Sequence, residues 1–177
     1  MSECDKGRRS GFSGEKIVES EDFVFFWKPP AVFSQWTPSK FTVDGTTYCC
    51  AEQYMMAKKA RLFADHVALR NILATKHPGE HQRLGRTVAK FDQKEWDRER
   101  FAIVVKANLE KFRQNSEMRS VLLATRGKTL VEASPVDKVW GIGLRADDIY
   151  VMNRSKWRGE NLLGKALMQV RETLLLG

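Results

Sequence analysis

Hydrophobic residues form short extended runs in the first part of the chain and have helical spacing through the rest. The run at 23–27 is aromatic and β-branched and stops at Pro29-Pro30, as expected for a strand. Residues 41–49 contain two further strand-like pieces around Asp44-Gly45, a pair that favours the tight turn of a hairpin. This part of the chain therefore predicts a small β element.

From residue 51 onward, apolar positions recur every three or four residues, which is the spacing of an amphipathic helix. The longest such stretch, 92–114, begins with Asp92 and Glu95 in the arrangement of a capping box. One further strand is expected at 129–133, where β-branched and apolar residues follow one another. Helices are expected at 51–64, 65–74, from Pro78 onward, and at 92–114, 117–124 and 159–176.

The sequence shows no internal repeat and no linker to a second domain. Residues 21–177 are therefore expected to form a single compact α+β domain that is mostly helical with a small β element. Residues 1–20 contain several glycines and serines and few large apolar side chains, so we expect a flexible tail there. No apolar run approaches the roughly 18 residues of a membrane span, and the polar N-terminus does not resemble a signal peptide. We therefore expect no membrane partner.

Composition adds one informative feature, the charge. The 177-residue chain is 42% hydrophobic and 29% charged, as is typical of globular proteins, but its net charge is +8. This excess indicates an anionic partner such as a nucleotide, a sugar phosphate or nucleic acid, with a basic but unpartnered surface as the alternative.

The three cysteines (4, 49 and 50) lack zinc-type spacing, so we expect no metal site and a reducing, cytoplasmic compartment. His66, His77 and His81 are expected to be solvated.

Glu52 lies where the predicted hairpin passes into the first helix. An acidic residue in the first turn of a helix is stabilised by the helix dipole, so capping alone would explain its position. A catalytic role would require a pocket, a shifted pKa and a scissile bond nearby. The residues themselves leave both interpretations open.

Segment 134–143 passes from a strand into a loop that contains an acid, an aromatic residue and two glycines. Asp137 could accept hydrogen bonds from ribose hydroxyls, and Trp140 offers a stacking face for a base or a sugar. Gly141 and Gly143 would let the backbone approach a ligand closely, although a turn around a core tryptophan explains the loop equally well. A dinucleotide fingerprint is excluded, because no third glycine follows. Asn161 begins the last helix, where it could cap the helix or help to bind an anion.

A series of short motifs runs in order from about Phe23 to the C-terminus. They are Phe33-Ser34-Gln35-Trp36, Tyr48 to Tyr54 with Glu52, Lys59-Ala60, Leu84-Gly85-Arg86, Trp96, Leu122 to Thr125, Leu130 to Ser134, Asp137 with Trp140-Gly141-Ile142-Gly143, and Asn161 to Gly164. No single motif is decisive, but the ordered set is specific and covers nearly all of the expected domain. It resembles the NADAR family of YbiA-like N-glycosidases.

The resemblance implies a compact, mostly helical fold that cleaves a C–N glycosidic bond without a metal or redox cofactor. It implies either of two substrates, namely phosphorylated ribosylamino-pyrimidine intermediates of riboflavin synthesis or ADP-ribose attached to guanine in DNA or RNA. Gln35 and Gln53 depart from the residues that many members have there, and this affects the choice of substrate more than the reaction. A non-catalytic module that binds ADP-ribose or nucleic acid is the alternative.

The same resemblance assigns the site residues. Glu52 is the implied catalytic carboxylate, and the role of Lys59 stays open between catalysis and phosphate binding. The implied substrate-binding residues are Ser34, Lys59, Arg86, Trp96, Asp137, Trp140, Gly141, Gly143 and Asn161.

Overall fold

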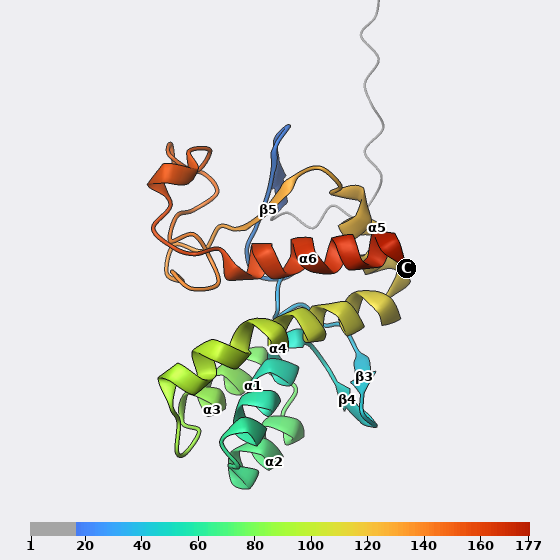
Figure 1. Ribbon diagram of the computed structural model, residues 1–177, viewed down its shortest axis with the longest axis vertical. Helices are drawn as coiled ribbons and strands as arrows, with labels where there is room; N and C mark the ends of the chain where they lie inside the picture. Colours follow the sequence, from blue (N-terminus) through green and yellow to red (C-terminus); the bar gives the residue numbers. More distant parts are fainter. Residues whose placement is uncertain (1–16) are drawn as a thin grey trace, which may run out of the picture.

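The computed structural model describes residues 17–177, which form two small β elements and six α-helices (Figure 1). The strands are β1 (Ile17–Glu19), β2 (Phe23–Phe26), β3 (Phe41–Val43), β4 (Thr46–Tyr48) and β5 (Thr129–Glu132). The helices are α1 (Ala51–Leu62), α2 (His66–Ala74), α3 (Pro78–Arg86), α4 (Gln93–Gln114), α5 (Ser116–Ala124) and α6 (Leu162–Leu176), with a 3₁₀ turn at Arg154–Lys156. The predicted α+β fold is confirmed.

The main sheet joins segments that are far apart in the sequence. Its strand order is β1-β2-β5, with β2 antiparallel to β1 and parallel to β5, while β3 and β4 form the predicted hairpin around Asp44-Gly45. All four residues of β2 are buried, which explains why this strand reads as an unbroken apolar run rather than as an alternating one. The sheet therefore fixes the end of β5 relative to the N-terminal part of the domain.

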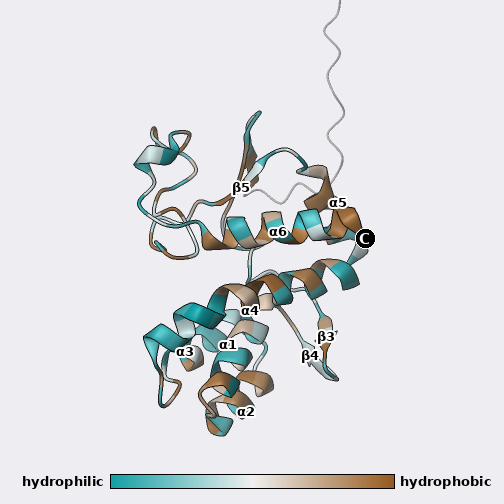
Figure 2. Cartoon of the chain, in the orientation of Figure 1, coloured by the Kyte–Doolittle hydropathy of each residue, from teal (hydrophilic) through white to brown (hydrophobic). Residues whose placement is uncertain are grey.

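Helices α4 and α6 lie side by side and connect the two halves of the domain (Figure 1). Helix α4 packs against α1 on one side and against α6 on the other, and α6 in turn packs on β5. Hydrophobic and hydrophilic residues alternate along α6, as expected for a helix with one face against the core (Figure 2). Within residues 17–177, no helix is both long enough and apolar enough to cross a bilayer.

Three expectations from the sequence need correction. Ile17–Glu19 pairs with β2, so the folded region begins before residue 21 and the expected tail is shorter; the rest of that tail, residues 1–16, lies outside the described residues. The last helix begins at Leu162 rather than at 159, because the preceding residues bond back to the 138–141 loop. His81 is fully buried instead of solvated.

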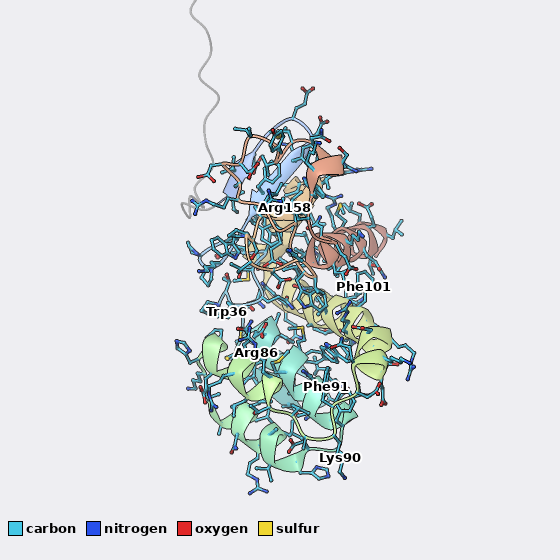
Figure 3. All side chains as sticks on the ribbon, turned by 90° about the vertical axis from the view of Figure 1, so that its left-hand side faces the viewer. Trp36, Arg86, Lys90, Phe91, Phe101 and Arg158 are labelled. Atoms are coloured by element: carbon cyan, nitrogen blue, oxygen red, sulfur yellow. The ribbon has the colours of Figure 1, made fainter. Side chains whose placement is uncertain are left out.

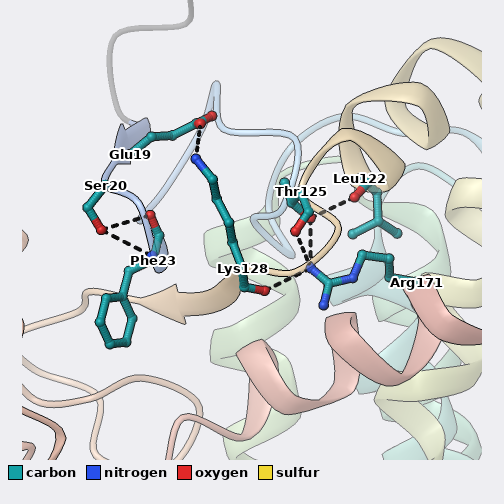
Figure 4. A network of polar contacts seen from close by, with 7 residues as sticks. All are labelled: Glu19, Ser20, Phe23, Leu122, Thr125, Lys128 and Arg171. Atoms are coloured by element: carbon teal, nitrogen blue, oxygen red, sulfur yellow. Dashed lines mark hydrogen bonds and ion pairs between the residues drawn. The ribbon is translucent and has the colours of Figure 1, made fainter.

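A buried cation holds the turn between α5 and β5 against α6. The Arg171 guanidinium donates from Nη1 to the Thr125 carbonyl at 2.6 Å, to the Thr125 hydroxyl at 3.0 Å and to the Lys128 carbonyl at 2.9 Å (Figure 4). Hydrogen bonds from a charged donor are stronger than neutral ones, and these join two carbonyls of the turn that follows α5. Arg171 therefore fixes the position at which β5 starts.

The other end of β5 is held by Asn161. Its Oδ1 accepts from the Glu132 backbone N–H at 3.0 Å, and its Nδ2 donates to the Leu130 carbonyl at 2.9 Å. Gly164 lies against the same place, where an added Cβ would collide with the Leu130 carbonyl and the Asn161 carboxamide. Only glycine leaves room for α6 to approach β5 this closely.

Replacing Gly164 with alanine is expected to destabilise the protein, although alanine is intrinsically the better helix former by up to about 1 kcal/mol. Steric overlap with backbone that cannot move freely costs about 1–3 kcal/mol and should lower Tm by several degrees in thermal unfolding followed by circular dichroism. Gly177→Ala is the control, because the nearest atom to its added Cβ is 3.9 Å away. An unchanged or higher Tm for Gly164→Ala would contradict this account of the packing.

Candidate active site

A cavity of about 680 Å³ lies between the α1–α3–α4 side of the domain and the segment that follows β5. One wall comes from the loop at 34–36 together with α1, α3 and the start of α4, and the opposite wall comes from residues 132–140. In Figure 3, Trp36 and Arg86 are labelled on the helical side of the molecule and Arg158 on the sheet side. The volume is within the range of small-molecule sites.

Three acidic side chains line the cavity. Glu52 comes from the first turn of α1, Glu132 from the end of β5, and Asp137 from the loop that follows. Glu52 is only 3% exposed, and neither its Oε1 nor the buried Oε2 of Glu132 has a hydrogen-bond partner within residues 17–177. Buried polar atoms are nearly always paired, so two unpaired carboxyl oxygens in one cavity indicate a site prepared for a ligand.

The environment of Glu52 disfavours its charged form. Burial raises the pKa of Glu52 to about 8, and the negative charge of Asp137 contributes to the rise, while Trp36 and Arg86 oppose it. Burial likewise raises the pKa of Glu132 to about 8, with further contributions from Asp137 and Glu52. Shifts of this kind are typical of carboxyl groups that exchange protons near neutral pH.

Asp137 has a structural role as well as a place in the cavity wall. Its Oδ1 accepts from the backbone N–H groups of Val139 and Trp140, both at 2.8 Å, and its own N–H donates to the Ser134 hydroxyl at 3.2 Å. These bonds fold the loop into a tight turn that brings Trp140 to the cavity. One carboxylate therefore both shapes the loop and adds negative charge beside Glu52.

Cations and indole rings complete the lining. The cations are Lys28, Lys59, Arg86 and Lys138, and the indoles are Trp27, Trp36, Trp96 and Trp140. Lys59 is held between aromatic rings, with its Nζ 4.0 Å from the Phe91 centroid and 5.4 Å from the Trp96 centroid. Burial lowers the pKa of Lys59 below its ordinary value. The cavity thus combines flat stacking surfaces with positive groups suited to a phosphate.

The 33–36 loop, which carries Ser34 into the lining, is fixed by α4. The fully buried Lys111 donates from Nζ to the carbonyls of Val32 at 2.6 Å and Ser34 at 3.0 Å. Asn108 donates from Nδ2 to Gln35 Oε1 at 2.9 Å, which leaves the Gln35 Nε2 without a partner among the described residues. Gln35 lines the cavity, so its amide N–H groups can bind a ligand.

The structure brings together most of the residues expected from the sequence but separates three of them from the cavity. Glu52, Ser34, Lys59, Arg86, Trp96, Asp137 and Trp140 all line it. Gly141, Gly143 and Asn161 do not. A Cβ on Gly141 would lie 2.9 Å from the Glu132 carbonyl, Gly143 has a positive φ of 68°, and the Asn161 side chain bonds β5. We therefore propose that these three residues position the walls of the cavity.

Glu52 lies in the first turn of α1, as the helix-dipole interpretation expects, but that interpretation does not explain its buried oxygen, which is unpaired among residues 17–177. Cys50 is the N-cap of α1 and makes no capping hydrogen bond with its side chain, and the Glu52 Oε1 binds no backbone N–H in the described chain. Glu132 is the acidic residue that the sequence analysis missed. The sequence gives only a weak sign of Glu132, which is that a charged residue ends a strand whose two middle residues are apolar.

Fold and site together define a single-domain α+β protein with an acid-lined cavity walled by indole rings and cations. The NADAR domain profile matches residues 25–175. An N-glycosidase of Acanthamoeba polyphaga mimivirus is 43% identical over 166 residues, which is 88% of this chain and 98% of that protein. The Caenorhabditis elegans protein irg-1 is 38% identical over 179 residues, or 90% of this chain and 84% of that one.

A solved structure agrees with these relatives. The NMR structure of the Escherichia coli protein YbiA superposes with a TM-score of 0.73 at 30% identity and covers 92% of this chain and 90% of that one. The chain belongs to the NADAR family, and the predicted family membership is confirmed.

Replacing Glu132 with glutamine is expected to change how stability depends on pH. Because the folded-state pKa of about 8 lies above the ordinary value of 4.5, the folded state retains a proton that the unfolded chain loses. The stability that this retained proton contributes is complete below about pH 4.5 and decreases as the pH rises to about 8. Above that pH it no longer changes. A neutral amide does not titrate, so the free energy of unfolding of Glu132→Gln should not show this decrease. The difference in unfolding free energy between Glu132→Gln and wild type should therefore be more favourable to the variant by at least about 1 kcal/mol at about pH 9 than at about pH 5.

Urea unfolding at a series of pH values measures this difference. Glu99→Gln is the matched control, because Glu99 is exposed on α4. Parallel stability profiles for Glu132→Gln and wild type would show that Glu132 is not held protonated in the folded state.

Proposed function

We propose that this protein hydrolyses the C–N glycosidic bond of a phosphorylated ribosyl substrate, with Glu52 as the catalytic carboxylate. The observation that carries the proposal is the buried Glu52 oxygen, unpaired within the described chain, in a cavity lined by indoles and cations. The reaction class is supported by relatives from Acanthamoeba polyphaga mimivirus, Nostoc punctiforme and Escherichia coli that are named N-glycosidases. The finer choice of substrate rests on the chemistry of the cavity.

Breaking a ribosyl C–N bond places positive charge on the anomeric carbon and the ring oxygen in the transition state. A carboxylate beside that carbon stabilises the charge strongly, because the site is shielded from water. Glu52 takes this role in its ionised form, which Arg86 and the developing positive charge of the sugar favour against the effect of burial. It also accepts a proton from the attacking water as the new C–O bond forms. Protonated Glu132, from the facing wall, donates a proton to the departing base.

The remaining lining residues bind the two ends of such a substrate. Trp96 and Trp140 supply faces on which a base or a ribose can stack, and Asp137 can accept from a ribose hydroxyl. Arg86 and Lys59 can bind a phosphate group with charge-assisted hydrogen bonds. The net charge of +8 then favours the approach of an anionic substrate.

Two substrate types fit this chemistry, namely ribosylamino-pyrimidine phosphates and ADP-ribose attached to guanine in nucleic acid. We favour the smaller one, because a cavity of about 680 Å³ can enclose a phosphorylated nucleoside-sized molecule, whereas an ADP-ribosylated nucleic acid would extend outside it. We also propose that the reaction takes place in the cytoplasm, which the absence of a disulfide at Cys49 and Cys50 supports.

The first experiment compares Glu52→Gln with wild type on a ribosylamino-pyrimidine phosphate, following release of the base and the ribose phosphate. Glutamine keeps the shape of the side chain but can neither carry negative charge nor accept the water proton. We expect kcat to fall by about 10²-fold or more. Glu99→Gln, on the exposed face of α4, is the control and should retain activity. A folded Glu52→Gln enzyme with the wild-type rate would remove Glu52 from the mechanism.

A parallel assay uses ADP-ribosylated guanine in DNA. Turnover of the small phosphate alone supports the favoured substrate, and turnover of the DNA substrate alone replaces it with the second one. Saturable binding of both substrates without turnover of either would instead identify a non-catalytic binding module.

Arg86→Met tests the phosphate-binding role separately from the chemistry. Loss of a charge-assisted bond should raise KM for the phosphorylated substrate about tenfold or more while changing kcat less. The dephosphorylated ribosyl substrate is the control, because with it the variant loses only the effect of Arg86 on the pKa of Glu52. Equal KM changes for both substrates would assign Arg86 to another part of the ligand.

A further inference from the structure

A second cluster of reactive side chains lies at the start of α1, outside the lining of the cavity. The Cys49 and Cys50 sulfur atoms are 3.9 Å apart, and the Cys50 sulfur is 3.8 Å from Nδ1 of His81. One ligand atom from each of the three residues lies within 4.8 Å of the other two. The two cysteines precede α1, while His81 is in α3, so the cluster is created by folding.

His81 has a fixed orientation. Its ring is fully buried, and its Nε2 lies 3.0 Å from the Thr75 carbonyl oxygen. A carbonyl can only accept a hydrogen bond, so Nε2 carries the proton and Nδ1 presents its lone pair to the sulfur atoms. A histidine that donates one N–H to a backbone carbonyl while the other nitrogen faces thiols has the arrangement found at metal ligands.

Two of the three ligand–ligand separations fit a tetrahedral zinc site, and the third, between the Cys49 sulfur and the His81 ring, is within 4.8 Å. With Zn–S bonds of about 2.3 Å and Zn–N bonds of about 2.0–2.1 Å, ligand sulfurs are separated by about 3.8 Å, and sulfur and nitrogen by about 3.6 Å. The observed separations of 3.9 and 3.8 Å differ from these by a few tenths of an ångström. Cys49 is partly exposed, which gives an ion a route in and leaves a position for water.

Burial raises the pKa of the Cys50 thiol to about 12, so without a metal its sulfur carries a proton. A metal ion would displace that proton, because a coordinating thiol is deprotonated. Thiolate and imidazole ligands select zinc and other thiophilic ions over magnesium and calcium.

We propose that Cys49, Cys50 and His81 form a zinc-binding site, with water as the fourth ligand, that joins the start of α1 to α3. Binding there would fix the first turn of α1, which carries Glu52 two residues after Cys50. The site is independent of the proposed reaction, since none of its three ligands lines the cavity.

The experiment titrates the metal-free, reduced full-length protein with Zn²⁺ in competition with a chromophoric chelator. We expect stoichiometric binding, and Co²⁺ in place of Zn²⁺ should give thiolate-to-metal charge-transfer absorption with the visible bands of a tetrahedral ion. The folded chain has the assembled site and the unfolded chain does not, so zinc binding stabilises the folded state. A free zinc concentration of about a hundred times Kd should therefore raise Tm by about 5 °C or more.

Cys49→Ser is the decisive variant, because Cys49 is partly exposed and its replacement leaves the core intact. It should bind zinc at least about tenfold more weakly and lose the zinc-dependent rise in Tm. His81→Asn tests the buried ligand, provided that its circular dichroism spectrum matches wild type. His66→Gln is the control for a histidine outside the cluster and should bind zinc as wild type does.

Wild-type affinity in Cys49→Ser, or a Co²⁺ complex without thiolate absorption, would overturn the proposal. None of these measurements uses a glycosidic substrate, so their outcome is separate from that of the Glu52 assays.

Discussion

Strand β5 pairs with strand β2 along one edge. Along its other edge, the Asn161 carboxamide binds the backbone of β5. An unpaired buried backbone group would cost about 1–3 kcal/mol, so Asn161 stabilises the strand where no further strand can reach it. Arg171 of α6, nearly three helical turns after the N-cap Asn161, binds the turn before β5. Helix α6 thus holds both ends of the strand, and the direction in which Glu132 and the Asp137 loop leave it depends on these contacts.

The facing wall of the cavity depends on a different helix. Lys111 and Asn108 of α4 bind the loop that carries Ser34 and Gln35, and α4 lies against α6. The two walls are therefore connected through one helix pair rather than through the small sheets. This rigid frame matters because the carboxyl groups in the cavity are buried close to one another, which destabilises their charged forms. A looser frame would let them separate or become hydrated.

Most helices could be predicted from the sequence, because each has an apolar face with the period of a helix and several begin with a recognisable cap. The Asp92 capping box is an example, since its Oδ1 accepts from the Glu95 N–H at 2.7 Å. Strand β1 was missed because three residues in a polar context give no periodic signal, and the strand exists only through its pairing with β2. The environment of His81 could not be foreseen either, because its thiol neighbour is 31 positions away in the sequence.

The expected site residues with distinctive chemistry line the cavity, whereas those with ambiguous chemistry lie outside its lining. Glu52 and Asp137 were found through motifs, and both line the cavity. A glycine or an asparagine in a loop can either contact a ligand or allow close packing of the backbone. The sequence pattern is the same for the two roles. At Gly141 and Asn161 the packing role is the one observed. Glu132 was overlooked because a single acid at a strand end is usually solvated, whereas the fold places it opposite Glu52.

The clustering of aromatic residues has an optical consequence. Four of the five tryptophans of the chain, at positions 27, 36, 96 and 140, line the same cavity, and the fifth, Trp157, packs instead against Phe23. Indole emission is sensitive to stacking, to nearby charge and to the exclusion of water. Most of the indole rings of this protein therefore lie at the surface that a ligand would cover, so a change in intrinsic emission is the expected signal of an occupied cavity.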